Sequence, residues 1–135
     1  MSVVHPSPSS ARHRILVVDD DADVAWTTAA LLKLEGYDTH IAKDGQEAVE
    51  LVRQLQPSIV LMDLGMPHVN GFEAARQIRK QEGGSKILLC AITAYGTADI
   101  LERVKEAGFD RYLRKPATFD EVSAIVDDAS ADPVP

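Results

Sequence analysis

The chain has 135 residues, of which 45% are hydrophobic and 26% are charged, as is usual for one soluble globular domain. Its 14 Lys and Arg residues against 21 Asp and Glu residues give a net charge of -7, which opposes direct binding to nucleic-acid phosphates. No apolar run reaches the ~20 residues of a membrane helix, and no signal-peptide pattern starts the chain. These features predict a cytoplasmic domain with neither a membrane nor a nucleic-acid partner, in which the single cysteine, Cys90, is a buried thiol.

The two ends of the chain are predicted to be flexible tails, at residues 1–13 and 130–135, around one folded domain at residues 14–129. The first tail contains two prolines and four serines without an apolar period, and the second contains two prolines. The folded part is therefore expected to build a single core.

The folded part opens with a predicted strand and helix. Residues 15–18 form an apolar, β-branched run too short for a helix, which indicates a buried strand. Residues 22–35 show helical spacing and stop at Gly36, which indicates a helix. Trp26 is expected to lie off the face that meets the sheet and to be at least partly exposed. That inward face is expected to consist of Val24, Thr28, Leu31 and Leu32.

The same alternation predicts four further strand and helix pairs. The expected strands lie near residues 37–42, 59–62, 87–92 and 112–113, and the expected helices near residues 45–55, 71–80, 97–107 and 118–128. Thr118 and Glu121 have the spacing of a capping box at the start of the last helix. Five pairs in about 115 residues are too few for an eight-stranded barrel. The sequence thus predicts an α/β fold, a doubly wound (βα)5 sandwich with helices on both faces of an open parallel sheet.

Polar residues follow four of the five predicted strands, where ligands bind in such sheets. These residues are Asp19, Asp20 and Asp21 after the first strand, Asp63 after the third, Thr93 after the fourth and Lys115 after the fifth. Each alone could be structural: the acids could solvate loops, Thr93 could cap the next helix, and Lys115 could be a surface lysine. Together, carboxylates at one sheet edge repel by roughly 3 kcal/mol per pair at ~5 Å and an effective dielectric near 20, so they call for a counter-charge.

A Mg²⁺ ion, for which Mn²⁺ could substitute, would supply that counter-charge. Asp20 and Asp63 are the expected direct ligands. Asp19 is expected to bind directly or through water, and the backbone carbonyl of Gly65 could complete the set.

The same group of residues predicts phosphoryl chemistry. With the metal and Lys115 drawing charge from the phosphoryl oxygens, the carboxylate of Asp63 can attack phosphorus and hold it as an aspartyl phosphate. Thr93 would offer its hydroxyl to a phosphoryl oxygen.

Four strings at matching intervals resemble the receiver domains of two-component response regulators. They are Val17-Val18-Asp19-Asp20, Leu61-Met62-Asp63 with Met66-Pro67 and Gly71, Ala91-Ile92-Thr93-Ala94, and Tyr112-Leu113-Arg114-Lys115-Pro116. The likeness extends over residues 14 to about 128 and implies the flavodoxin-like strand order 2-1-3-4-5. It implies that Asp63 takes a phosphoryl group from a histidine of a sensor kinase or phosphotransfer protein, while Asp19 and Asp20 hold Mg²⁺ and Lys115 pairs with the phosphoryl group.

The resemblance also implies a switch rather than an enzyme acting on other substrates: the domain would catalyse only its own phosphorylation and dephosphorylation. Phosphate would draw Thr93 inward and Tyr112 would rotate toward the vacated space. This movement would remodel the face of the fourth helix, fifth strand and fifth helix, which signals to an effector protein and could support a homodimer. Trp26 could contact the histidine-bearing partner or pack against the last helix.

Two positions are expected to tune dephosphorylation. Gly65 has no side chain to orient the hydrolytic water, and Tyr95 could shield the phosphate from it.

A phosphatase of the haloacid-dehalogenase type is the alternative, because it also uses an aspartyl phosphate at a strand end. It needs a second acid two residues after the nucleophile, and Gly65 stands there. A flavin or nucleotide carrier is disfavoured by the three acids after the first strand. The receiver interpretation leaves open whether the chain is a stand-alone protein or part of a longer regulator or hybrid kinase.

Overall fold

The computed structural model describes residues 13–65 and 71–130. Almost all of both predicted tails, and the motif residues Met66 and Pro67, lie outside the described residues. Within them, the elements in chain order are β1 (Arg14–Val18), α2 (Ala22–Leu34), β2 (Asp38–Ala42), α3 (Gly45–Leu55), β3 (Ile59–Asp63), α4 (Gly71–Lys80), the 3-10 turn η1 (Gly84–Lys86), β4 (Leu88–Thr93), α5 (Ala98–Ala107), β5 (Arg111–Arg114) and α6 (Phe119–Ser130). The five predicted strand and helix pairs are thus confirmed, with boundaries that differ by a few residues.

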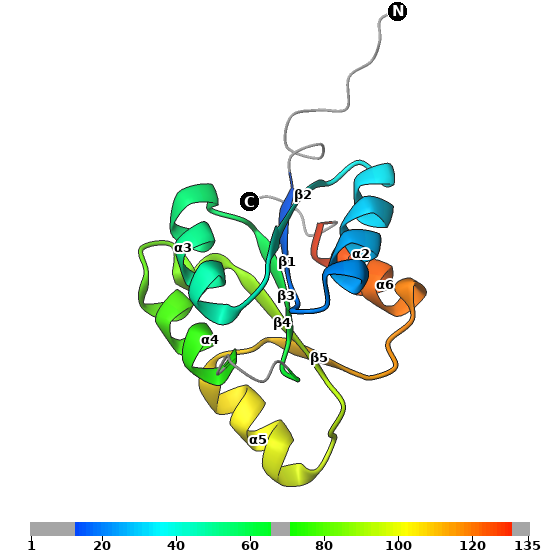
Figure 1. The fold of residues 1–135 in the computed structure, drawn as a ribbon. Coiled ribbons are helices and arrows are strands. Elements are labelled where there is room, and N and C mark those ends of the chain that lie inside the picture. The colour runs from blue at the N-terminus through cyan, green and yellow to red at the C-terminus, as the bar shows by residue number, and fades with distance from the viewer. Residues whose placement is uncertain (1–12, 66–70, 131–135) are drawn as a thin grey trace, which may run out of the picture.

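The five strands form one parallel sheet in the order β2-β1-β3-β4-β5 (Figure 1). This order confirms the predicted doubly wound fold. The chain reverses its direction of winding between β1 and β3, and in such sheets the crevice beyond the carboxyl ends of these strands is where ligands bind. The polar residues that follow the strands are therefore gathered at one edge.

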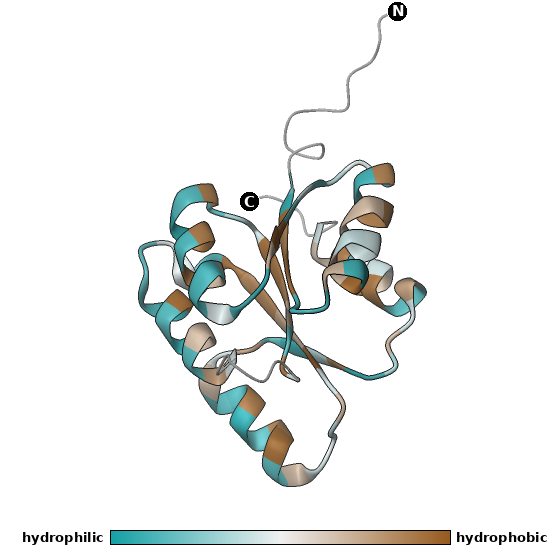
Figure 2. Ribbon diagram, in the orientation of Figure 1, coloured by the Kyte–Doolittle hydropathy of each residue, from teal (hydrophilic) through white to brown (hydrophobic). Residues whose placement is uncertain are grey.

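Helices cover the sheet on both faces, and we call these covers the α2/α6 layer and the α3/α4/α5 layer (Figure 1). Each layer has its own hydrophobic core against the sheet. Alternate residues of the central strands serve the two cores: Leu16 and Val60 lie in the α3/α4/α5 core, whereas Ile15 and Leu61 lie in the α2/α6 core. Figure 2 shows the resulting pattern, with apolar residues along the strands and polar residues on the outer sides of the helices.

Local hydrogen bonds fix the helix ends. The capping box at α6 is confirmed, because the Thr118 backbone N–H donates to Glu121 Oε1 at 2.9 Å and the Glu121 N–H donates to Thr118 Oγ1 at 3.1 Å. At the C-terminal end of α5, Gly108 has a φ of 107°, a left-handed conformation that favours glycine. The start and end signals read from the sequence thus act as expected.

The inward face of α2 differs from the prediction. Its buried residues are Ala25, Ala29 and Leu32, whereas Val24 is 49% exposed and Leu31 is 37% exposed. Leu32 is buried as predicted and Thr28 is half-buried, so the prediction was wrong for Val24 and Leu31 and missed the two alanines. Alanine on the inner face lets the helix axis approach the sheet closely, which bulkier side chains would not allow.

Trp26 is 66% exposed, which confirms its predicted position off the inner face of α2. It lines a hollow together with Lys33 of α2 and His40 of β2, so it lies beside the edge strand rather than against α6. Cys90 is buried, as predicted, and burial raises the pKa of its thiol to about 12. Among the described residues, no helix is long and apolar enough to span a membrane.

Candidate functional site

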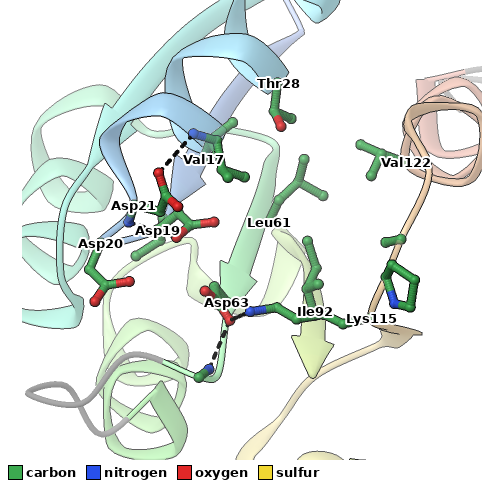
Figure 3. Close-up of a pocket in the computed structure, with 15 residues that line it drawn as sticks. Val17, Asp19, Asp20, Asp21, Thr28, Leu61, Asp63, Ile92, Lys115 and Val122 are labelled. Carbon is green, nitrogen blue, oxygen red and sulfur yellow. Dashed lines mark hydrogen bonds and ion pairs between the residues drawn. The ribbon is translucent and has the colours of Figure 1, made fainter. Parts of the chain in front are cut away.

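Asp63 lies at the centre of the carboxyl edge of the sheet (Figure 3). Its side chain is almost fully buried, and its Oδ1 atom lies 2.7 Å from Nζ of Lys115, which follows β5. The same oxygen accepts a hydrogen bond of 2.8 Å from the backbone N–H of Gly65. A buried carboxylate paired in this way is held in one orientation at the floor of the site. The peptide bond from Lys115 to Pro116 is cis.

Three carboxylates converge at this edge. Ligand oxygens of Asp19, Asp20 and Asp63 all lie within 4.8 Å of one another. The pKa of Asp19 is raised from 3.8 to about 6, chiefly because burial disfavours its charged form, and the neighbouring Asp63 adds to the rise. A bound cation would reverse that cost, so the oxygen-rich donor set fits a hard divalent ion such as Mg²⁺.

Asp21 has a different role from the neighbouring acids Asp19 and Asp20. Its Oδ1 accepts hydrogen bonds from the backbone N–H groups of Asp23 and Val24, at 3.0 and 3.2 Å, and so caps the N-terminus of α2. Its own N–H donates to Asp19 Oδ1 at 2.9 Å, which orients that carboxylate. Asp21 was left out of the expected metal ligands, but this capping role was not predicted.

Thr93 is buried at the end of β4, and its hydroxyl is engaged by the residues that follow. Thr93 Oγ1 accepts a 3.0 Å hydrogen bond from the Tyr95 N–H and lies 3.2 Å from the Tyr95 carbonyl oxygen, to which it can donate. The interpretation of Thr93 as a helix cap is wrong, because Thr97 caps α5 through the N–H of Ile100. Tyr95 is 66% exposed.

Two glycines that follow strands lie close to neighbouring side chains. A Cβ atom on Gly65 would lie 3.3 Å from Asp63 Oδ1 and 3.4 Å from Lys115 Nζ, so a side chain would crowd the ion pair. A Cβ atom on Gly96 would lie 2.6 Å from the side chain of Arg114. Sequence reasoning missed Gly96, since only the fold brings the loop after β4 against β5.

The acids Asp19, Asp20, Asp21 and Asp63 line one pocket of about 600 Å³ together with Lys115 (Figure 3). Sequence reasoning found its charged half but missed its apolar half, which lies between α2 and α6 and includes Thr28, Leu61, Ile92, Ala117 and Val122. The signal that could have revealed this half is the small size of the residues at Thr28 and Ala117.

The chain matches the model of the response regulator receiver domain over residues 15–127. It is 41% identical over 115 residues to the DNA-binding response regulator MtrA of Mycobacterium tuberculosis (strain ATCC 25618 / H37Rv), covering 85% of this chain and 49% of that protein. The chain thus spans about half the length of these curated relatives.

Solved structures agree with this match. The receiver domain of a Pseudomonas aeruginosa PAO1 sensor histidine kinase, crystallised with a magnesium ion coordinated in the active-site cleft, has a TM-score of 0.80 and 30% identity, covering 89% of this chain and 98% of that one. The Vibrio cholerae chemotaxis protein CheY4 has a TM-score of 0.82 and covers 87% of this chain and 98% of its own, but at 22% identity it supports the fold alone.

The chain belongs to the response regulator receiver domain family. Receiver domains accept a phosphoryl group in two-component signalling, bind Mg²⁺ at an acidic site, and interact with histidine kinases and effectors. This membership does not favour the phosphatase alternative. Because MtrA is a DNA-binding regulator, the expectation that this chain has no nucleic-acid partner stays a prediction.

Proposed function

We propose that Asp63 is the phosphoacceptor of this receiver domain. The observation that carries the proposal is the position of its carboxylate, which is buried at the end of β3, 2.7 Å from Lys115 and grouped with the carboxylates of Asp19 and Asp20. An Asp63 oxygen would attack phosphorus, and the Lys115 ammonium would pair with a phosphoryl oxygen as negative charge develops there.

The proposed metal ligands are the side chains of Asp19, Asp20 and Asp63 and the backbone carbonyl of Gly65, with Mn²⁺ able to replace Mg²⁺. When bound, the ion would neutralise charge on the phosphoryl oxygens. The raised pKa of Asp19 supports this assignment, because a partly buried acid beside another acid favours a nearby cation.

The proposed switch begins at Thr93. To reach a phosphoryl oxygen, its hydroxyl would exchange the Tyr95 backbone for the phosphate, which would shift the loop between β4 and α5. Tyr112 of β5 is 45% exposed and is proposed to turn inward in response. The surface formed by α5, β5 and α6 would then signal to an effector protein and could support a homodimer.

The wider proposal concerns donors and boundaries. The folded domain, predicted at residues 14–129, is proposed to extend to the end of α6 at Ser130, with residues 1–13 and 131–135 as tails. The protein is proposed to be cytoplasmic, with no membrane or direct nucleic-acid partner. Its phosphodonor would be the phosphohistidine of a sensor kinase or phosphotransfer protein. The domain would catalyse only its own phosphorylation and dephosphorylation.

Gly65 and Tyr95 are proposed to tune the phosphate lifetime. Gly65 has no side chain to orient a hydrolytic water, and Tyr95, whose ring is exposed, would shield the phosphate from it. The Tyr95→Ala variant should therefore lose its phosphate faster than the wild type, as measured by intact mass over time. A slower loss in this variant would contradict shielding.

The proposed function is tested by intact-mass measurement after incubation with acetyl phosphate and Mg²⁺. The wild type should gain one phosphoryl group, whereas Asp63→Asn and an EDTA-treated sample should gain none. Asp120→Asn, which removes an exposed carboxylate of α6, is the matched control and should behave as the wild type does. Phosphorylation that persists in Asp63→Asn would overturn the site assignment.

A further inference from the structure

The pocket at the strand ends has two chemically different halves (Figure 3). The charged half holds the carboxylates and Lys115. The apolar half continues from it between α2 and α6 and includes Thr28, Leu61, Ile92, Ala117 and Val122. Its total volume of about 600 Å³ lies well inside the roughly 300–1,000 Å³ of small-molecule sites.

The α2 residues that line the apolar half are Val24 and Thr28, and the loop before α6 contributes the small residue Ala117. Ala25 and Ala29 are buried instead on the face of α2 that packs against the sheet. The helices α2 and α6 make few close contacts with each other, whereas α4 contacts both α3 and α5. The space is open to the acidic site, so one ligand can occupy both halves.

The two halves define the chemistry of that ligand. Lys115 and a metal ion held by the carboxylates would bind a phosphoryl group, while the walls formed by Leu61 and Val122 would bind a hydrocarbon chain. A sugar or a nucleobase would leave its polar groups unpaired against those walls. The ligand is therefore a phosphoryl group joined to an aliphatic tail.

Resting on the proposed function of Asp63, we propose that the apolar half binds the carbon chain of an acyl phosphate, so that donors with a tail of about four carbons are preferred to acetyl phosphate. In the transfer, an Asp63 oxygen forms the new bond to phosphorus, the bond from phosphorus to the acyl oxygen breaks, and its electron pair leaves with the carboxylate. This leaving group needs no proton. An alkyl phosphate would need a general acid, and Gly65 has no side chain to supply one.

The test compares acetyl, propionyl and butyryl phosphate, whose carboxylate leaving groups have nearly the same basicity. The second-order rate constant for phosphorylation, measured by intact mass at timed quenches with Mg²⁺, should rise about tenfold from acetyl to butyryl phosphate. Ala117→Leu fills the apolar half and should abolish this preference. Ala124→Leu makes the same change on an exposed site of α6 and should retain it. Equal rate constants for all three donors would overturn the proposal.

Calorimetry with unreactive phosphonates provides a reading that does not depend on transfer. In the presence of Mg²⁺, butylphosphonate should bind the wild type at least about fivefold more tightly than methylphosphonate, and Ala117→Leu should lose this difference. Equal affinities would overturn the binding of the chain. The protein could bind butylphosphonate more tightly and yet not be phosphorylated by any acyl phosphate. That result would overturn the proposed function of Asp63 but would support binding of the chain in the apolar half.

Discussion

On one face of the sheet, α3, α4 and α5 pack side by side, whereas on the other face α2 and α6 make few close contacts and leave the pocket between them. The two layers share the strands, so the difference arises from the helices. In the α3/α4/α5 layer, residues such as Val52, Ile78 and Val104 fill the space between helix and sheet. In the α2/α6 layer, alanines bring α2 close to the sheet and leave space beside it.

A half-buried arginine closes the α3/α4/α5 layer. The side chain of Arg79 at the end of α4 is only 20% exposed. Its guanidinium donates to three backbone carbonyls and one carboxylate at 2.6 to 2.9 Å, those of Gly84, Ile87, Gly108 and Asp110. It thus joins the end of α4 to the turn before β4 and to the end of α5. The tightly packed α3/α4/α5 layer thus contributes stability, whereas the α2/α6 layer has room for a binding site.

The largest expected effect is the loss of this arginine. Arg79→Met keeps a long apolar stem but removes the side-chain donor from the carbonyls of Ile87 and Gly108, whereas Gly84 and Asp110 each keep a backbone donor. This loss should cost about 2–4 kcal/mol in the free energy of unfolding. Urea denaturation followed by circular dichroism measures it. Arg76→Met is the matched control on the same helix, since Arg76 makes a surface pair with Glu73 and its loss should cost less than about 0.5 kcal/mol. Similar losses in the two variants would show that the arginine does not close the layer.

A smaller effect separates the two layers directly. Ala48 of α3 is fully buried, so Ala48→Leu should overpack its layer and cost about 1–3 kcal/mol. Thr28→Leu in α2 extends instead into the open pocket and improves helix propensity, so stability should change by less than about 1 kcal/mol. Thermal unfolding of both variants measures the contrast. If Thr28→Leu were the more destabilising change, the pocket would not be available space.

The sequence was sufficient to predict the fold, because β-branched runs and helical spacing alternate five times and the helix ends carry recognisable caps such as Thr118. The residues proposed for the charged half were also found, since parallel strands end at one edge and Asp63 and Lys115 directly follow them. These predictions depend on position along single elements.

Predictions that depend on contacts between elements were less successful. The spacing of α2 allowed two inner faces, and only packing against the sheet selects Ala25 and Ala29. The resemblance separated Asp21 from the expected metal ligands, but its capping role was not predicted, because that role depends on hydrogen bonds to the start of α2. The apolar half of the pocket could not be predicted either, since a cavity is defined by side chains that do not fill the space.

The smallest expected effect concerns the pH dependence of the site. The pKa of Asp19 is about 6 in the folded domain against 3.8 for the free side chain, so the fold favours its protonated form. Its contribution to stability is therefore greatest below pH ~4 and is lost as the pH rises through ~6, by about 1 kcal/mol once the screening of a partly exposed group is allowed for. The measurement is the free energy of unfolding in urea at pH 4 and at pH 7, with EDTA present. Asp19→Asn should lack this pH-dependent contribution, so the difference between wild type and variant should change between the two pH values. At pH 7, Mg²⁺ should stabilise the folded wild type more than the folded variant, because the ion binds the ionised carboxylates, of which the variant has one fewer. If the free energies of unfolding of wild type and variant changed with pH in parallel, burial would not disfavour the ionised form of Asp19.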